Sequence, residues 1–339
     1  MIKDAIRKVA GRGSLSEAEA HAAMGQVMDG QATPAQIAAL ITALRMKGET
    51  VDEIAGFARA MRERARRITP NADVLIDVVG TGGDRLSTFN ISTTTAFVVA
   101  AAGGYVAKHG NRAVSRLSGA ADVLEALGVQ IQVSPEVVRR AIEDIGIGFL
   151  FAPIYHAAMK HAVAPRKEIG IRTVFNVLGP LTNPANASFL VVGAYDPALT
   201  EIMARVLGEM GARRAFVVHG LDGLDEVSTV GPTQVSELRN GSVRTYTITP
   251  EELGLPRVDA GSIVGGRPEE NAAITTAVLR GEDGPRQDIV LANAAAALVA
   301  AEIAGDWREG IGLARRAIAS GAAYEKLEAL RAHTRAAVS

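Results

Sequence analysis

The sequence of residues 75–128, LIDVVGTGGDRLSTFNISTTTAFVVAAAGGYVAKHGNRAVSRLSGAADVLEALG, decides the fold. It contains two polar, glycine-rich loops, 80–92 and 108–119, and each lies between apolar segments. A strand is predicted at 74–79, before the first loop, and a helix at 93–102, after it. A loop of this kind places bare backbone N–H groups at the positive end of a helix dipole, which favours an anion.

The second loop follows a predicted strand at 105–107 and leads into a predicted helix at 120–127. Ser92 and Ser118 are the expected caps of the two helices, and Gly128 is the expected end of the second. Tight turns alone would explain one such loop equally well. Two loops rich in Lys, Arg, Asn, Ser and Thr favour a ligand with two separated anionic groups. Neither loop has the GxGxxG or GxxxxGK[ST] spacing of the common nucleotide sites.

The composition is that of an ordinary globular protein: 339 residues, 48% hydrophobic and 22% charged. A formal net charge of −1 does not favour nucleic acid or an anionic membrane as a partner. Cysteine is absent, which excludes disulfides and fits a reducing cytoplasm. The N-terminal sequence lacks the apolar core of a signal peptide, and apolar runs such as 289–301 are too short to span a bilayer. We therefore expect a soluble, cytoplasmic protein.

Residues 1–69 carry apolar side chains at helical spacing throughout, which predicts a small all-helical domain. Its helix starts and stops are marked by capping boxes, a cap followed by proline, and glycines, at Ser16, Thr33, Thr50, Gly30 and Gly48. From residue 70 short apolar strands alternate with helices. This alternation predicts an α/β domain with a central, mostly parallel sheet surrounded by helices.

Strands of this domain are expected at 74–79, 105–107, 129–133, 149–151, 189–194 and 214–219. The Asn240-Gly241 pair predicts a hairpin of strands 234–239 and 242–249 on a type I′ turn. Further helices are expected at 135–145, 268–279, 288–304, 307–319 and 324–332.

Two adjacent acids, Asp225 and Glu226, follow the predicted strand at 214–219. α/β sheets bind ligands at strand ends, and Mg²⁺ takes one or two carboxylates together with water and phosphate oxygens. Adjacent acids in a loop are also often plain surface charge, so both interpretations stay open. Asp84, in the first loop, suits sugar hydroxyls or a bridging cation, and an Asx-turn would also explain it.

The segment 151–185 mixes histidines and cations with apolar residues. His156 and His161 are five residues apart, with no cysteine or HExxH pattern, so buried, hydrogen-bonded histidines are favoured over a zinc site. Arg166 beside Pro165 lies in apolar surroundings, where a guanidinium can hold a carboxylate with two hydrogen bonds.

VGTGGDxxxTFNIST at 79–93 and KHGNRxxSxxSGxADVLEALG at 108–128 resemble the anthranilate phosphoribosyltransferase family, which has the nucleoside phosphorylase/phosphoribosyltransferase fold. The resemblance covers nearly the whole chain and includes LDEVSTVGPT at 224–233. It implies a small helical domain, 1–69, completed by about 166–183, and a large α/β domain, 70–339, that binds 5-phosphoribosyl-1-pyrophosphate. It also implies a homodimer formed through the helical domain.

The same resemblance implies magnesium-dependent transfer of the 5-phosphoribosyl group from 5-phosphoribosyl-1-pyrophosphate to the amine of anthranilate, in tryptophan biosynthesis. The implied donor-binding residues are Gly80, Gly83, Asp84, Thr88, Asn90, Ile91, Ser92, Thr93, Lys108, His109, Gly110, Asn111, Arg112, Ala113, Val114, Ser115, Arg116 and Ala120. The implied anthranilate-binding residues are Gly80, Asn111 and Arg166. The implied Mg²⁺ ligands are Ser92, Asp225 and Glu226. No residue is assigned as an acid or a base.

The chain departs from the family pattern at 115–120, where many relatives have SSKSGS. Arg116 keeps a donor, whereas Leu117 lacks a cation and Ala120 lacks a hydroxyl. Two alternatives stay open: a pyrimidine nucleoside phosphorylase of the same fold, and a non-catalytic relative that binds nucleic acid. The TFNIST run and the adjacent acids argue against the first, and the net charge of −1 argues against the second.

Overall fold

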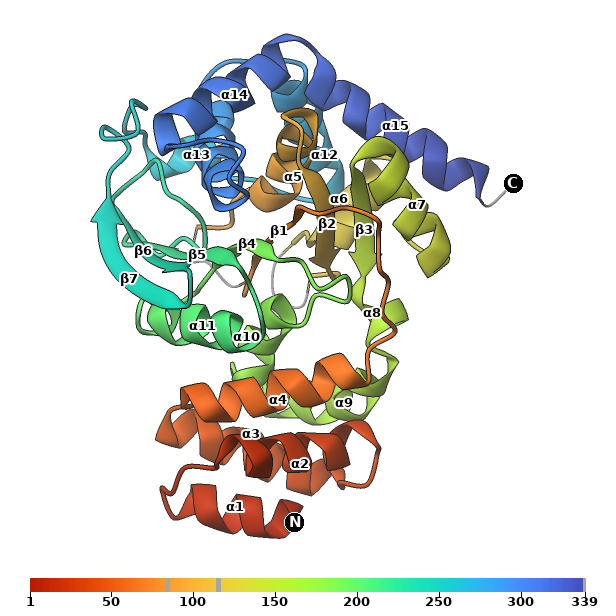
Figure 1. Cartoon of the computed structure of the whole chain (residues 1–339), viewed down its shortest axis with the longest axis vertical. Helices are drawn as coiled ribbons and strands as arrows, with labels where there is room; N and C mark the ends of the chain where they lie inside the picture. The colour runs from red at the N-terminus through yellow and green to blue at the C-terminus, as the bar shows by residue number, and fades with distance from the viewer. Residues whose placement is uncertain (83–85, 114–116, 338–339) are drawn as a thin grey trace.

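The computed structural model describes residues 1–82, 86–113 and 117–337. At the N-terminal end, shown at the bottom of Figure 1, lies a helical unit of α1 (Ile2–Ala10), α2 (Glu17–Met28), α3 (Pro34–Lys47) and α4 (Val51–Glu63). The predicted caps are confirmed: Ser16, Thr33 and Thr50 each accept a hydrogen bond from the backbone N–H three residues later. Gly48 ends α3 with a φ of 87°, a conformation that favours glycine.

The described part of the large domain is built on a seven-stranded sheet in the order β3-β2-β1-β4-β5-β6-β7. Its strands are β1 (Leu75–Gly80), β2 (Tyr105–Gly110), β3 (Ile147–Phe151), β4 (Phe189–Gly193), β5 (Arg214–Gly220), β6 (Thr233–Arg239) and β7 (Ser242–Ile248). Strands β1–β5 pair in parallel, and β6 and β7 are added through antiparallel pairing, so the predicted fold class is confirmed. Asn240 and Gly241 both have positive φ, 51° and 76°, as a type I′ turn requires.

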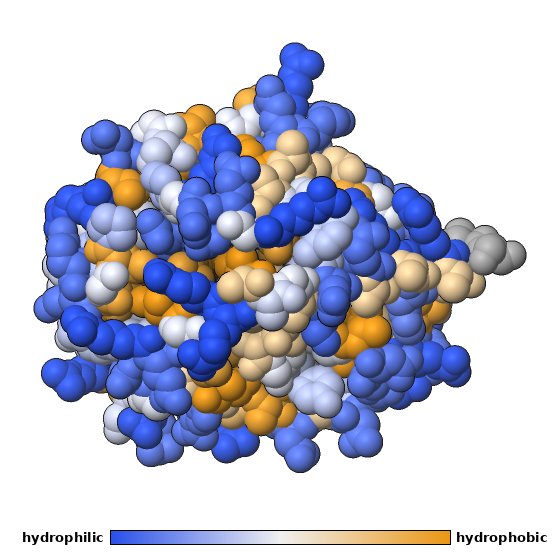
Figure 2. Space-filling view, turned by 90° about the horizontal axis from the view of Figure 1, so that it is seen from above, coloured by the Kyte–Doolittle hydropathy of each residue, from blue (hydrophilic) through white to orange (hydrophobic). Residues whose placement is uncertain are grey.

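Helices cover both faces of this sheet (Figure 1). One face packs mainly against α5 (Ile91–Ala101), α12 (Pro268–Leu279), α13 (Pro285–Ala300), α14 (Trp307–Ala319) and α15 (Ala322–Ala336). The other packs against α7 (Pro135–Ile145) and α11 (Ala198–Glu209), and α10 (Val174–Leu181) packs on α11. Polar side chains cover most of the surface seen from above, with apolar ones in separate patches (Figure 2). In the part of the chain that is described, no helix combines the length and apolar character needed to cross a membrane.

One apolar core joins the helical unit to the sheet. It runs from α1–α4 through α10 and α11 to the side chains of β4 and β5, such as Val192 and Val217. Arg62, at the end of α4, donates to the carbonyl oxygens of Leu181 and Met210, each at 2.9 Å. Helix α9 (Lys160–Ile169) packs on α2 and α3, and α10 packs on α3 and α4. The domain boundaries given above remain a prediction.

The prediction of a strand at 129–133 is wrong. The segment is irregular and lies between α6 (Ala120–Ala126) and α7 (Pro135–Ile145). Val129, Ile131 and Val133 are buried at alternate positions, as in a strand. Within the described chain, however, the segment adds to no strand and reaches the C-terminal helix through Gln130 N–H, which donates to Thr334 Oγ1 at 3.2 Å. The alternation therefore predicted burial correctly and sheet pairing incorrectly.

The predicted caps of the two loop helices are also wrong. Helix α5 begins earlier than expected, with Asn90 at its N-cap, and Ser92 lies in its first turn. Helix α6 begins at Ala120, as predicted, but its N-cap is Gly119 rather than Ser118. Neither N-cap residue caps its helix with a side chain, because Asn90 is engaged elsewhere and glycine has no side chain.

Candidate functional site

The predicted site residues come together because their strands are parallel neighbours. The first glycine loop follows β1, the second follows β2, and Asp225 and Glu226 lie in the loop after β5. The carboxyl ends of these strands share one edge of the sheet. Gly82 N–H donates to Asp225 Oδ2 at 2.8 Å, which joins the first loop directly to the acidic pair.

Asp225 occupies space that exists only because two neighbouring residues, Gly80 and Gly193, have no Cβ. It is 3% exposed, and a Cβ at Gly80 would lie 2.6 Å from its Oδ2 atom. A Cβ at Gly193, the last residue of β4, would overlap the backbone carbonyl of Asp225. Position 193 therefore requires glycine for reasons of space, whereas a Cβ at Gly80 would displace the Asp225 carboxylate. Sequence reasoning found Gly80 and missed Gly193, although a glycine at the end of an apolar strand could have been noticed.

Lys108 places a buried cation beside Ser92. Its Nζ atom donates to the carbonyl oxygen of Val78 at 2.7 Å and to Ser92 Oγ at 3.3 Å. Burial lowers the pKa of Lys108, and the neighbouring Asp77 and Glu226 carboxylates act in the opposite direction. The first turn of α5, Lys108 and the acidic pair thus form one continuous polar site.

The donor set at this edge fits magnesium. Glu226 is 9% exposed and follows Asp225 directly in the sequence, so the same loop carries two carboxylates. Within the described residues, no three His, Asp or Glu side chains are close enough to hold a metal by themselves. Mg²⁺ typically uses one or two protein carboxylates and completes its shell with water and substrate phosphate oxygens. The pair therefore suits an ion that is bound together with a phosphate ligand.

The first loop is anchored to the predicted helix at 268–279, although the sequence did not predict this contact. Asn90 Oδ1 accepts hydrogen bonds from Ser118 Oγ at 3.0 Å and from Asn271 Nδ2 at 2.9 Å. Thr88 forms a β-bridge with Val264. Asn90 therefore connects the first loop, the second loop and α12.

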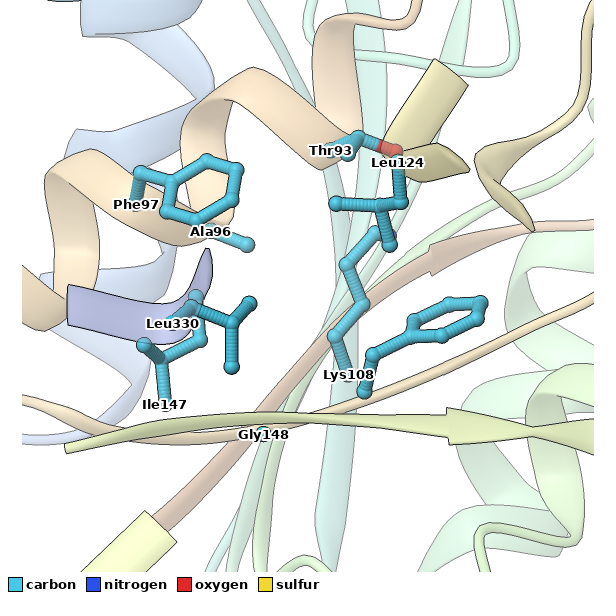
Figure 3. Close-up of a pocket in the computed structure, with 9 residues that line it drawn as sticks. Thr93, Ala96, Phe97, Lys108, Leu124, Ile147, Gly148 and Leu330 are labelled. Atoms are coloured by element: carbon cyan, nitrogen blue, oxygen red, sulfur yellow. The ribbon is translucent and has the colours of Figure 1, made fainter. Parts of the chain in front are cut away.

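Ile91 and Thr93 point their side chains into the domain. Ile91 belongs to the apolar core, and the Thr93 hydroxyl is buried without a hydrogen-bond partner. A void of about 10 Å³, room for no more than one water molecule, lies between α5, α6, β2, β3 and α15, and Thr93 is one of the residues that line it (Figure 3). These two residues can meet a ligand only through their backbone N–H groups.

The described part of the second loop is fastened to α6. Arg112 donates to Asp122 at 3.0 Å and to Glu125 at 2.9 Å, so its charge faces these acids. Asp122 Oδ2 also accepts from the N–H groups of Ala113 and Gly119, each at 2.9 Å. Gly119 is required because a Cβ there would overlap the backbone of Ala113.

The remaining residues of this loop differ in exposure. Asn111 is exposed, whereas Gly110 and Ala120 are partly buried, and a Cβ at Gly110 would lie 3.0 Å from that of Ala120. The side chain of Leu117 is exposed. Five predicted donor-binding residues lie outside the described residues: Gly83, Asp84, Val114, Ser115 and Arg116.

Arg166 lies on α9, at a distance from the other predicted residues along the chain. Its guanidinium lies over the ring of Phe175, 5.1 Å from the centroid, and burial lowers its pKa. Among the described residues, no carboxylate lies within ion-pair distance of it and no hydrogen bond joins it to Gly80 or Asn111. A partly desolvated guanidinium of this kind favours a carboxylate ligand.

Beneath the site lies a buried polar network. Asp77 accepts from His109 N–H at 3.2 Å and from Asn183 Nδ2 at 2.7 Å. The His109 ring lies 5.2 Å from that of His156, centroid to centroid, and His156 Nε2 is 3.0 Å from the Thr182 carbonyl oxygen. Burial raises the pKa of Asp77 to about 6 and lowers those of His109 and His156 to about 3 and about 4.

The lowered pKa of His156 predicts that the folded protein loses stability in acid. The unfolded histidine, with a pKa of 6.5, binds its proton before the folded one does, so the stability present above pH 6.5 is lost as pH falls towards 4. At pH 5 this loss is about 2 kcal/mol. His156→Gln can still donate to the Thr182 carbonyl oxygen and does not titrate. We expect urea unfolding at pH 7 and pH 5 to show a smaller difference in the variant.

Asp77 acts with the opposite sign, since its contribution is present below pH 3.8 and is lost as pH rises through about 6. Asp77 and His109 are both present in the variant, so comparison with the wild type reports His156 together with its effect on the neighbouring His109. An equally steep pH dependence in both proteins would contradict the prediction.

Comparisons with known proteins agree with this geometry. The chain matches the Glycosyl transferase family, helical bundle domain, over residues 3–65, and the Glycosyl transferase family, a/b domain, over residues 72–324. Anthranilate phosphoribosyltransferase from Moorella thermoacetica is 57% identical over 330 residues, which cover 97% of each chain.

Solved structures agree as well. The anthranilate phosphoribosyltransferase of Thermus thermophilus superposes with a TM-score of 0.93 at 47% identity, covering 98% of this chain and 99% of that one. The Saccharomyces cerevisiae enzyme, solved in complex with PRPP and Mg, gives a TM-score of 0.90 at 30% identity, covering 99% and 98%. Relatives of this identity and coverage are decisive: the chain belongs to the anthranilate phosphoribosyltransferase family.

Proposed function

We propose that this protein transfers the 5-phosphoribosyl group from 5-phosphoribosyl-1-pyrophosphate to the amine of anthranilate, with Mg²⁺, in tryptophan biosynthesis. The products are N-(5-phosphoribosyl)anthranilate and pyrophosphate. The observation that carries the proposal is the hydrogen bond from Gly82 to Asp225. It joins a glycine-rich loop of the kind that binds phosphate to a pair of acids of the kind that binds Mg²⁺. Family membership supports the same reaction.

The residues divide into three roles in this proposal. The glycine loop after β1, the first turn of α5 and the loop after β2 hold the sugar donor, with Lys108 as the buried cation. Ser92, Asp225 and Glu226 hold Mg²⁺. Gly80, Asn111 and Arg166 contact anthranilate, with Arg166 at its carboxylate.

In this reaction the protein must stabilise a leaving group, pyrophosphate, and orient a weak nucleophile, the amine of anthranilate. The bond from the anomeric carbon to pyrophosphate breaks, the bond to the anthranilate nitrogen forms, and the amine loses one proton. Backbone N–H groups and Lys108 are placed to stabilise charge on the departing pyrophosphate. Bound Mg²⁺ supplies further positive charge there. Positioning matters more than a general base, and none is assigned.

The direct test follows anthranilate fluorescence with purified protein, sugar donor and Mg²⁺, omitting each component in turn. We expect fluorescence to fall only when all three are present. No fall with folded protein would contradict the proposal. A phosphate-dependent cleavage of pyrimidine nucleosides, assayed in parallel, would instead identify the phosphorylase alternative.

Arg166→Ala is expected to raise the KM for anthranilate about 10- to 100-fold, because a hydrogen bond to a charged group is lost. The kcat at saturating anthranilate and the KM for the sugar donor should change little. Arg166→Lys should recover only part of the affinity, since lysine lacks the two-pronged geometry. Arg140→Ala, an exposed change on α7, is the control. A main effect on magnesium dependence would refute the assigned role.

The organisation of the enzyme is also part of the proposal. We infer that residues of about 166–183 complete the helical domain and that two copies associate through it. Exposed apolar side chains on this unit, Met46 and Ile171, support such a contact. Sedimentation of wild type and Met46→Glu tests it. We also propose a cytoplasmic location, which cell fractionation would test.

A further inference from the structure

Asn293 is a buried polar residue in an otherwise apolar helix. It lies on α13 between alanines and leucines and is fully buried. Burying an amide in such surroundings costs free energy unless every polar atom has a partner. Asn293 meets this condition completely, because its oxygen accepts one hydrogen bond and its nitrogen donates two.

Two of these three hydrogen bonds join Asn293 to a single residue, Val227. Val227 lies in the loop between β5 and β6 that carries Asp225 and Glu226, here called the acidic loop. Val227 N–H donates to Asn293 Oδ1 at 2.9 Å, and Asn293 Nδ2 donates to the Val227 carbonyl oxygen at 2.9 Å. The third runs to the carbonyl oxygen of Ile289, within the same helix, at 2.8 Å. Val227 lies outside the strands of the described chain, so this side chain takes the place of a β-sheet neighbour.

Val227 directly follows Asp225 and Glu226. The two hydrogen bonds from Asn293 therefore fix the backbone next to these carboxylates. On the other side, the backbone of Asp225 is pressed against Gly193. Farther out, the loop is closed by a hydrogen bond from Ser228 Oγ to Asp222 and by one from Leu221 N–H to the Pro232 carbonyl oxygen at 2.8 Å. The acidic pair therefore lies between a strand end and α13.

We propose that Asn293 is the positioning residue for the carboxylates of Asp225 and Glu226, acting through the backbone of Val227. The inference rests on the proposed magnesium role of that pair. Partners behind the ligands of a metal commonly contribute about 10- to 100-fold to its affinity, because they hold the ligands in the binding geometry.

The test uses Asn293→Ala, which removes the amide, and Asn293→Leu, which removes it while keeping most of its volume. Binding of Mn²⁺, in place of Mg²⁺, is measured by electron paramagnetic resonance with the sugar donor present and anthranilate absent. Mn²⁺ held by the donor alone is subtracted. We expect the Mn²⁺ dissociation constant to rise about 10- to 100-fold in both variants. The apparent KM for Mg²⁺ should rise while the KM for anthranilate stays unchanged.

Ser236→Ala is the matched control for a lost buried hydrogen-bonding group, since its hydroxyl bonds Thr200 and Thr245, neither of which belongs to the loop that carries Asp225 and Glu226. It should bind Mn²⁺ like the wild type. If Asp225→Asn weakens Mn²⁺ binding and both Asn293 variants do not, the positioning role of Asn293 is refuted while the proposed magnesium site stands. If Asp225→Asn has no effect, the proposed magnesium site itself fails. Failure of both Asn293 variants to fold would also overturn the inference, because the amide would then serve global stability.

Discussion

Replacing Asp225 by asparagine is expected to lower magnesium-dependent turnover by about 100- to 1,000-fold. Asparagine has nearly the same shape, and its oxygen can still accept the hydrogen bond from Gly82 N–H. The loop geometry is therefore kept and the negative charge is lost. Because a neutral amide is a poor ligand for Mg²⁺, the stabilisation of the leaving pyrophosphate should weaken. The measurement is kcat as a function of Mg²⁺ concentration.

The control for Asp225→Asn is Asp283→Asn, which removes one negative charge from an exposed position between α12 and α13. It should leave kcat unchanged. Turnover within a few-fold of wild type in Asp225→Asn, at every Mg²⁺ concentration, would rule out the carboxylate as a ligand. A raised KM for anthranilate with normal kcat would place Asp225 at the acceptor instead.

Gly193→Ala is expected to lower turnover by at least about 100-fold, although the substitution adds only a methyl group at the end of a strand. The added Cβ would overlap the carbonyl oxygen of Asp225, and a backbone atom cannot rotate away as a side chain can. Either β4 or the acidic loop must move, and a displacement of about 1 Å can cost this much in rate. The overpacking should also destabilise the fold by about 1–3 kcal/mol. Steady-state kinetics and urea unfolding measure both effects.

Gly312→Ala is the matched change without a clash, because Gly312 lies within α14 and a Cβ there would meet only the end of the Arg316 side chain at 3.4 Å. Alanine favours a helix over glycine, so this variant should be as stable as wild type or more so. Normal kcat in Gly193→Ala would mean that the loop can yield at Asp225 without loss of function.

Local signals predicted most of the fold. Strands and helices flanked by glycine or by a cap were placed within a few residues, and the Asn240-Gly241 turn was predicted because its conformation depends on those two residues alone. The segment 129–133 shows the limit of such signals. Its alternation reports burial, whereas a strand also needs a neighbour to bond with, and this depends on the packing of distant helices.

The candidate site was predictable only in part for the same reason. The loops and the acidic pair carry local patterns, so the residues were found, but the contact from Gly82 to Asp225 joins residues 143 positions apart in the sequence. Gly193 matters because of a backbone 32 residues away along the chain (225 minus 193). Asn293 had one signal, a polar residue inside the apolar run 289–301, but the sequence does not show which backbone groups that amide bonds.

The apolar core that joins the helical unit to β4 and β5 has a consequence for building hybrid enzymes. The family is described as two modules, a helical bundle and an α/β domain, which suggests a boundary near residue 70 at which genes could be recombined. That boundary cuts through no strand or helix, yet the side chains on its two sides interlock through α10 and α11. A helical module taken from a relative would therefore need its partner surface on α10 and α11 transplanted with it, as well as the anchor points of Arg62.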